Sequence, residues 1–598
     1  MIIQKFSVNN HPIQTLLSWV ESNEIAIPEI QRPFVWEATK VRDLIDSLFR
    51  GYPIGYIIAW QNPTVRLKDG SSSRGKKILI DGQQRITALM AALLGKEIID
   101  KDYRRKRIII AFNPDEMIFE VSNSAIQKDK RWISDISKVF RPDFKILDKL
   151  KEYCTYNPEI PEDKILTAID SLKSIINIPV GLIELSPELE ISEITEIFIR
   201  INSSGVVLNQ ADFAMSKIAV DEKNGGNLLR KAIDYFCHLA VEPEYFRQLK
   251  EIDKDFINTE YFQKMLWLKD DKDDIYDPSY TDMLRVSFTS KFRRGRLQDL
   301  VALLSGRDFE TRQYKEEIAE QSFNKLREGV LDFMNENHFK KFVMIVRSAG
   351  FIDSSMIRSQ NALNFAYILY LTLRELNYNQ AKIEQLVRKW FVLSVLTSRY
   401  SGSPESQFDI DIRRVYEQGP EEYIKNVISA ELSDTYWTIG LPQSMDTSVA
   451  SSPIFNVFLA AQVKMNDKGF LSKDITVKDL IELKGDIHHI YPKNYLKKQN
   501  YSRGMYNQIA NYVMAQSEIN IAIGDKEPEK YFSELINQCE TKVAKYGAII
   551  DIEQLRENLQ ANCIPLKLIE GETLNYEDFL KERRFLMANK IKEYFALL

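Results

Sequence analysis

The sequence has few of the residues from which disulfides and zinc clamps are built. Only four of its 598 residues are cysteines and five are histidines. The cysteines lie far apart and none belongs to a Cys-x-x-Cys pair, which excludes a sequence-readable zinc ribbon and argues against a disulfide framework. We therefore expect four reduced cysteines in a cytoplasmic protein, namely Cys154, Cys237, Cys539 and Cys563.

Long apolar runs and a strong charge of one sign are also missing. The apolar runs fall short of the roughly 18 residues that a membrane span needs, and Met1 to Phe6 does not start a signal peptide. The 80 basic and 85 acidic residues give a net charge of -5, which argues against a simple basic coat protein for nucleic acid but allows local basic patches. We expect a soluble protein without membrane contact.

The length predicts several domains, at roughly 100–200 residues for each. Residues 1–220 mix strand-like runs with amphipathic helices, such as the apolar stripe of Glu37–Arg50. The strand signals fade over residues 221–440, where a helical middle segment is expected. Residues 441–598 contain a Ser/Thr-rich linker at Thr447–Ser452 and end in charged helices. The predicted fold class is therefore α+β multidomain.

A polar cluster, Asp81-Gly82-Gln83-Gln84-Arg85, follows the strand-like run Lys77–Ile80 and opens a helix. A strand-to-helix junction is a good anion site because the first N–H groups of the helix are unpaired and its dipole is positive there. Arg85 can donate two parallel hydrogen bonds to phosphate oxygens, and Asp81 can bind magnesium or orient a water molecule. The alternative is a structural one, with Asp81 as the helix N-cap and Arg85 in a surface ion pair.

Two further segments place arginines beside turns. One is Gln31-Arg32-Pro33 within an apolar and aromatic frame, and the other runs from Phe198 through Arg200 and Asn202 to Gly205. Packing of Arg32 and a plain helix C-cap at Asn202 are the structural alternatives. Taken with Arg85, the arginines of these segments can converge on one polyanion.

Together these motifs resemble the GmrSD-type family, whose N-terminal domain is ParB/sulfiredoxin-like and α+β. The resemblance covers roughly residues 1–220 and implies a domain that binds and hydrolyses nucleoside triphosphate, commonly with magnesium. It implies catalytic roles for Asp81 and Arg85. The nucleotide pocket that it implies is lined by Gln31, Arg32, Asp81, Gly82, Gln83, Gln84, Arg85, Thr87, Arg200 and Asn202.

The second cluster is a pair of adjacent histidines, His488 and His489, within Asp486-Ile-His-His-Ile-Tyr-Pro. With so few histidines in the chain, this pairing is informative, since imidazole serves both as a metal ligand and as a general base near neutral pH. Asn511 and Asn520 follow on either side of an apolar, strand-like run. A structural role for the histidine pair is the alternative.

This order resembles the ββα-metal (HNH, His-Me finger) nucleases, and more narrowly the C-terminal nuclease domain that accompanies GmrSD-type N-terminal domains. The resemblance implies that His489 is the general base and that Asn511 orients its ring by accepting from the other nitrogen. It also implies that His488 and Asn520 hold one Mg²⁺ or Mn²⁺ ion, and it leaves open whether Asp486 joins them. Because neighbours in a strand face opposite ways, the two histidines can share one site only at a strand end or bulge.

Basic residues follow directly after the histidines and could bind a phosphate backbone, although a solvated loop is the alternative. They are Lys493, Lys497, Lys498 and Arg503. The resemblance then implies a nucleotide-regulated, metal-dependent DNA endonuclease of type IV restriction, active in bacterial anti-phage defence on double-stranded, modified DNA. Alternatives are a nucleotide-switched DNA sensor with an inactive nuclease head, and a nicking or RNA-directed nuclease. Self-association into a homo-oligomer is compatible with the sequence.

Overall fold

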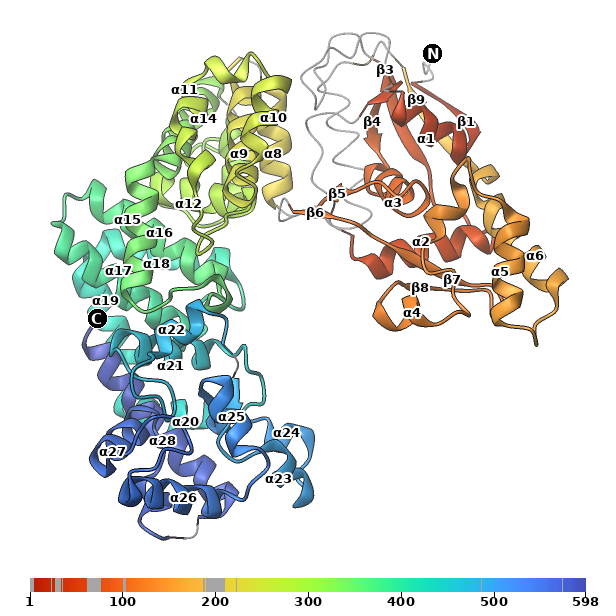
Figure 1. The fold of residues 1–598 in the computed structure, drawn as a ribbon. Coiled ribbons are helices and arrows are strands. Elements are labelled where there is room, and N and C mark those ends of the chain that lie inside the picture. The colour runs from red at the N-terminus through yellow and green to blue at the C-terminus, as the bar shows by residue number, and fades with distance from the viewer. Residues whose placement is uncertain are drawn as a thin grey trace. The chain divides into compact units, whose positions relative to one another are not determined.

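The structure is a computed structural model (Figure 1). Its chain divides into two compact units. The first unit holds residues 1–271, 279–281 and 301–323, and the second holds residues 272–278, 282–300 and 324–598. The residues that the structure describes are 5–22, 24–26, 34, 36–61, 77–100, 104–186, 189, 210–221, 223–313, 315–485, 487–572 and 574–598. Within these ranges, the helices are all too short or too polar to cross a membrane. The boundaries at residues 220 and 440 stay a prediction.

A five-stranded mixed sheet organises the N-terminal part of the first unit, with the strand order β1-β9-β3-β4-β2. β3 pairs parallel with β9 and antiparallel with β4, whereas β1 is antiparallel to β9 at one edge. The strands are β1 (Phe6–Pro12), β2 (Ile25–Ala26), β3 (Ile57–Gln61), β4 (Lys77–Asp81) and β9 (Pro179–Leu185). The strand expected just before the Asp81–Arg85 cluster is therefore present as β4.

The helix expected over Glu37–Arg50 is α2 (Ala38–Phe49), and it buries the predicted apolar stripe, including Val41 and Ile45. Gly51 follows it at φ +74°, a left-handed conformation that glycine adopts without strain. α3 (Gln83–Leu93) buries Ile86 and Leu89 in the same core. The other elements before residue 187 are α1 (Ile13–Glu21), β5 (Ile98–Ile99), β6 (Arg105–Lys106), β7 (Ile110–Asn113), β8 (Ile118–Val121), α4 (Ser124–Lys128), α5 (Ile146–Tyr156) and α6 (Glu162–Ser174).

Residues 210–431 are helical in the described part of the chain, as the loss of strand signals predicts. α16 and α17 pack against each other, and most of their side chains are buried. The helices are α8 (Gln210–Val220), α9 (Gly226–Val241), α10 (Tyr245–Ile252), α11 (Glu260–Lys264), α12 (Tyr280–Phe292), α13 (Leu297–Leu304), α14 (Glu316–Met334), α15 (Glu336–Ser348), α16 (Gln360–Glu375), α17 (Gln380–Leu396), α18 (Pro404–Gln418) and α19 (Pro420–Glu431).

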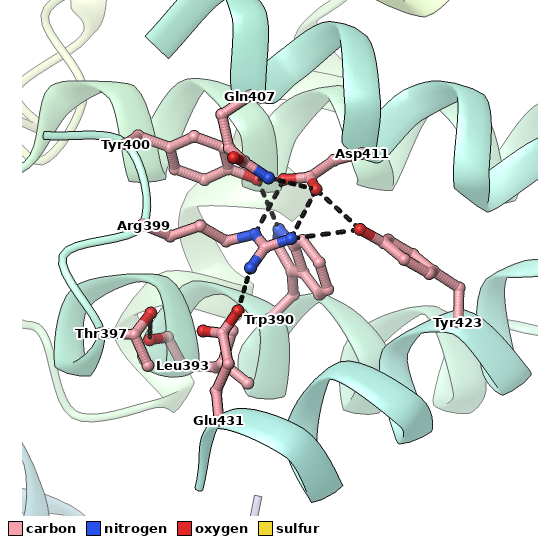
Figure 2. A network of polar contacts seen from close by, with 9 residues as sticks. All are labelled: Trp390, Leu393, Thr397, Arg399, Tyr400, Gln407, Asp411, Tyr423 and Glu431. Atoms are coloured by element: carbon pink, nitrogen blue, oxygen red, sulfur yellow. Dashed lines mark hydrogen bonds and ion pairs between the residues drawn. The ribbon is translucent and has the colours of Figure 1, made fainter. Parts of the chain in front are cut away.

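A buried polar network ties the last three of these helices together (Figure 2). Asp411 of α18 is fully buried and accepts hydrogen bonds from Nε and Nη2 of Arg399 at 2.9 and 2.6 Å. The hydroxyls of Tyr400 and Tyr423 each donate to Asp411 at 2.7 Å. Burial by itself would lower the pKa of Arg399, but the bonds to Asp411 raise that pKa above its ordinary value. Each charge is thus compensated inside the helical core.

The C-terminal part of the second unit surrounds a two-stranded sheet with helices (Figure 1). Its strands are β10 (Ile487–His489) and β11 (Tyr512–Met514). Its helices are α20 (Leu441–Ser444), α21 (Pro453–Lys464), α22 (Val477–Glu482), α23 (Lys493–Lys498), α24 (Arg503–Tyr506), α25 (Ser517–Ile523), α26 (Pro528–Thr541), α27 (Ile552–Ala561) and α28 (Tyr576–Ala596). The chain is therefore mixed α/β with a largely helical C-terminal surround.

Candidate functional site

The histidine pair lies on β10, in a strand–strand–helix arrangement. β10 pairs antiparallel with β11, which places His488 opposite Val513 and His489 opposite Tyr512. α25 follows β11 after two residues and carries Asn520. The order agrees with the one expected for a ββα-metal site. The assignment of the segment to that nuclease class stays a prediction.

The two histidines occupy different environments, as the alternation of a strand requires. His488 is buried, and its Nε2 lies 3.1 Å from the carbonyl oxygen of Ala515. His489 is half-buried, and its Nε2 lies 2.9 Å from Oδ1 of Asn507. The ring of His489 also meets Tyr512 edge to face, with 5.1 Å between the ring centroids.

The side chain that contacts His489 is therefore Asn507, whereas the sequence predicts Asn511 in that position. Oδ1 of Asn511 accepts from the backbone N–H of Tyr491 at 2.8 Å. Its Nδ2 donates to the carbonyl oxygens of Tyr491 and Tyr506 at 3.0 and 3.2 Å. A fully buried carboxamide must satisfy its donors and its acceptor, and backbone groups of the loop do so here. Asn511 thus closes the loop between β10 and β11, and its catalytic role stays a prediction.

Burial is the main influence on the protonation of His489. It lowers the pKa of the imidazole, and the hydrogen bond with Asn507 partly offsets this effect. The positive charge of Lys493 and a charged His488 would lower the pKa of His489 further. The ring is consequently neutral at neutral pH, which is the state in which an imidazole can accept a proton.

The loop between β10 and β11 is fastened by buried side chains of the C-terminal helices. Arg583 of α28 donates from Nη1 to the carbonyl oxygen of Ala510 at 2.7 Å, and burial lowers its pKa to about 10. Tyr531 of α26 donates to the carbonyl oxygen of Ile490 at 2.8 Å, and Tyr576 donates to that of Met505 at 2.9 Å. These bonds satisfy backbone acceptors on both halves of the loop, so the loop is held in one conformation.

The predicted metal ligands fit a divalent ion in their chemistry. If Nε2–H of His488 donates to the Ala515 carbonyl, the ring has its lone pair on Nδ1, which is how many metal-binding histidines are oriented. Asn520 is exposed on α25 and offers a carboxamide oxygen. Asp486 lies outside the described residues. Across the described ranges, no three His, Cys, Asp or Glu side chains gather into a metal cluster, so waters and phosphate oxygens would complete the shell.

The predicted DNA-binding residues lie on two short helices, whereas the sequence suggests a loop. Lys493, Lys497 and Lys498 belong to α23, and Arg503 begins α24; all four are exposed. The ammonium groups of Lys493 and Lys497 each lie 5.8 Å from the centroid of the Tyr506 ring. Lys498 instead forms an ion pair with Asp525 at 2.7 Å. Lys493 and Lys497 are therefore better placed than Lys498 to meet a phosphate backbone.

The polar cluster from Asp81 to Arg85 lies at the junction of β4 and α3, as predicted. The N-cap of α3 is Gly82 at φ +96°, so Asp81 is the last residue of β4 and does not cap the helix. Asp81 accepts from Nη2 of Arg85 at 2.7 Å, and Nη1 of Arg85 donates to the carbonyl oxygen of Ile54 at 2.9 Å. Arg85 thus connects the junction to the chain segment that leads into β3.

Two glycines at this junction leave room for Arg85 and for Ile57. A Cβ atom on Gly55 would lie 2.4 Å from Nη1 of Arg85, and one on Gly82 would lie 2.4 Å from Cδ1 of Ile57. The structural alternative for Arg85, an ion pair with Asp81, is therefore formed, although the pair is only partly exposed at 17% and 26%. A phosphate near Arg85 would have to compete with Asp81 for the same guanidinium.

The rest of the predicted nucleotide pocket is described only in part. Gln83 is buried, and Gln84 and Thr87 are partly buried on α3. The positions of Gln31, Arg32, Arg200 and Asn202 lie outside the described residues. The pocket residues that the structure describes therefore lie at the junction of β4 and α3, where the N-terminus of α3 is close to the carboxylate of Asp81.

Comparison with known proteins adds two findings. Residues 13–219 match the family model described as GmrSD restriction endonuclease, N-terminal domain. Over nearly its full length, the chain is also similar to an uncharacterized protein of Methanocaldococcus jannaschii, with 21% identity across 98% of this chain and 99% of that protein. The first match supports the predicted relationship to the GmrSD family for the N-terminal third of the chain. The second indicates that both parts of the chain occur together in a distant relative.

Proposed function

We propose that the chain is a restriction endonuclease that cleaves DNA in its C-terminal part under the control of a nucleotide bound to its N-terminal part. The ring of His489, held by the carboxamide of Asn507 in a strand–strand–helix frame, is the observation that carries the proposal. The match of residues 13–219 to a restriction endonuclease family supports the same conclusion. Modified, double-stranded DNA is the proposed substrate, within defence against foreign DNA.

His489 acts as the general base in the proposed reaction. Its neutral imidazole takes a proton from a water molecule, and the resulting hydroxide attacks the phosphorus of a phosphodiester. His488 and Asn520 would hold one Mg²⁺ or Mn²⁺ ion, which when bound neutralises charge on the phosphoryl and leaving oxygens. Lys493 and Lys497 position the strand through its phosphates.

The N-terminal junction is the proposed site of nucleoside triphosphate binding and hydrolysis. The start of α3 presents backbone N–H groups and a positive dipole, which favour phosphate. Asp81 orients the attacking water or a magnesium ion, and Arg85 keeps the Asp81 carboxylate in place. The bonds of the arginine support this division of roles, since Asp81 and the Ile54 carbonyl each take one N–H of its terminal nitrogens.

One experiment separates the proposed activity from its alternatives. Modified plasmid, unmodified plasmid, nicked plasmid and RNA are each incubated with the protein and Mg²⁺, with and without ATP or GTP, beside a His489→Ala control. We expect cleavage of modified duplex DNA that depends on Mg²⁺, responds to nucleotide and is absent in the control. DNA binding without Mg²⁺-dependent cleavage would instead favour a sensor, and cleavage of RNA alone would redirect the substrate assignment.

A further inference from the structure

The side chain of Asn507 has no role in the sequence motif, yet it makes the hydrogen bond that fixes the ring of His489. Its Oδ1 lies 2.9 Å from Nε2 of the imidazole. We propose that Asn507 is a positioning residue that sets the tautomer of His489 and aims Nδ1 toward the scissile phosphate. This inference rests on the proposed nuclease function and adds to it the residue that orients the base.

The tautomer follows from the donors and acceptors of the two side chains. An amide oxygen can only accept, so the bond to Oδ1 requires a hydrogen on Nε2. A neutral imidazole carries one N–H, and its lone pair is then on Nδ1, at the other side of the ring from Asn507. Without this bond both tautomers are populated, and in one of them Nδ1 carries a hydrogen and cannot take a proton.

The ring is held at two points, which fixes its plane as well as its tautomer. Asn507 holds Nε2, and the edge-to-face contact with Tyr512, at an interplanar angle of 89°, restricts rotation about the Cβ–Cγ bond. Tyr512 is paired with His489 across the two-stranded sheet, so this contact is built into the strand register. An orienting contact of this kind is what a general base needs, because proton transfer depends on heavy-atom distance and direction.

The loop around Asn507 is itself braced on both sides. The carbonyl oxygen of the preceding residue, Tyr506, accepts from Asn511 at 3.2 Å and from the Tyr576 hydroxyl at 3.3 Å. The following residue, Gln508, accepts from Nη2 of Arg584 at 2.9 Å and donates to the Gly504 carbonyl at 2.9 Å. Asn511 therefore acts on the ring of His489 through the backbone that carries Asn507.

The test compares substitutions that keep or remove the acceptor at one position. Asn507→Leu keeps the size of the side chain and removes the acceptor, whereas Asn507→Asp keeps an acceptor and cannot donate. Asn507→Ser repeats the loss with a polar side chain that is too short to reach the ring. Asn494→Ala, an exposed asparagine on α23, is the matched control. Cleavage is measured at about pH 8.5, well above the ordinary histidine pKa of about 6.5.

We expect Asn507→Leu and Asn507→Ser to lower kcat about 10- to 100-fold, with KM, DNA affinity without metal and Tm unchanged. Asn507→Asp should retain most of the wild-type kcat, and Asn494→Ala all of it. Solid-state ¹⁵N NMR of histidine-labelled protein supplies a readout that needs no activity. The His489 signals, assigned by their loss in His489→Gln, should show a protonated Nε2 in the wild type and a tautomer mixture in Asn507→Leu.

An unchanged kcat or an unchanged tautomer in both Asn507→Leu and Asn507→Ser would overturn the proposal. Failure of the nuclease function itself is recognised separately, because His489→Ala would then cleave DNA like the wild type whatever occupies position 507. If His489→Ala is inactive and the Asn507 variants are all fully active, the base assignment stands and only the positioning role falls.

Discussion

Two polar clusters of the second unit illustrate the difference between a side-chain network that stabilises and one that is prepared for chemistry. In the network around Asp411, the carboxylate receives bonds from Arg399, Tyr400, Gln407 and Tyr423, so both oxygens are saturated (Figure 2). In the histidine site, by contrast, Asn507 is hydrogen-bonded to one nitrogen of His489, and the other nitrogen is the one proposed to take a proton. The first arrangement compensates buried charges, whereas the second orients the proposed base.

The sharpest test of this comparison is removal of the base. His489→Ala should lower DNA cleavage by up to about 10⁴-fold, while nucleotide hydrolysis and Tm stay near wild-type values, because the ring makes few bonds that hold the fold. Cleavage assays and thermal unfolding of the same preparation measure both effects. Retained cleavage would rule out the assignment of His489 as the base.

Removal of the Asp411 carboxylate should have the opposite effect, a loss of stability instead of a loss of cleavage. Asp411→Ala leaves Arg399 buried with Glu431 as its remaining charged partner, and we expect a loss of about 3–5 kcal/mol in the free energy of unfolding. Denaturant unfolding measures this loss. Asp434→Ala is the control, since Asp434 is 93% exposed in its pair with Lys592 and should change stability by less than about 0.5 kcal/mol. Equal effects of the two substitutions would remove the distinction between the clusters.

Arg85 lies between these extremes, because it is bonded like Arg399 but belongs to a candidate site. Asp81→Ala or Arg85→Ala should lower nucleotide hydrolysis about 10²- to 10³-fold. Arg85→Lys should do nearly as much, because an ammonium lacks the fork that reaches both Asp81 and the Ile54 carbonyl. Steady-state phosphate release measures the effect, with Arg50→Ala as a surface control. Normal turnover in all three variants would show that the pocket is elsewhere.

The pH dependence of cleavage should reveal the environment of His489. Burial lowers the pKa of the ring below the ordinary value of 6.5, so the catalytically competent neutral form persists at lower pH. The acidic limb of the kcat profile should therefore have its midpoint below pH 6.5, and activity should fall as the pH drops through that midpoint. A midpoint above pH 6.5 would contradict this environment.

The smallest effects are expected on the basic surface. Lys493→Ala and Lys497→Ala should each weaken DNA binding several-fold and reduce the salt slope of the binding constant by about 1. Lys498→Ala should change less, because its ammonium is paired with Asp525. Lys425→Ala, an exposed lysine of α19, is the control. DNA affinities measured between 50 and 200 mM salt test this expectation. An equal salt slope for every variant would argue against DNA binding by Lys493 and Lys497.

The sequence predicts the local features of both sites better than their long-range contacts. The apolar stripe of α2 and the strand before Asp81 are local patterns, and both are present in the structure. Asp81 as an N-cap is wrong, because Gly82 takes a left-handed conformation and starts α3 itself. Such a choice depends on the close approach of Ile57, which local patterning does not encode.

The partner of His489 could not be read from spacing for a similar reason. Asn507 and Asn511 lie on one loop at nearly equal separations from the histidine, and only the fold decides which carboxamide turns inward to the backbone. The bonds around Asp411 likewise join α18 to α19 and to the connection after α17, through residues that lie 12 positions from Asp411 on either side. Spacing indicates which residue types are available, and tertiary packing then assigns their partners.

Arg583 has a consequence for how the protein can be dissected. Its guanidinium, on the final helix α28, forms no ion pair with a carboxylate of the described residues. It donates hydrogen bonds to the carbonyl oxygens of Ala510 and Asn562. Residues near position 583 therefore brace a loop more than seventy positions earlier. A fragment trimmed to the strand–strand–helix segment alone would lack this contact, so we expect that an excised form of the proposed nuclease part needs the last helix to keep this loop in place.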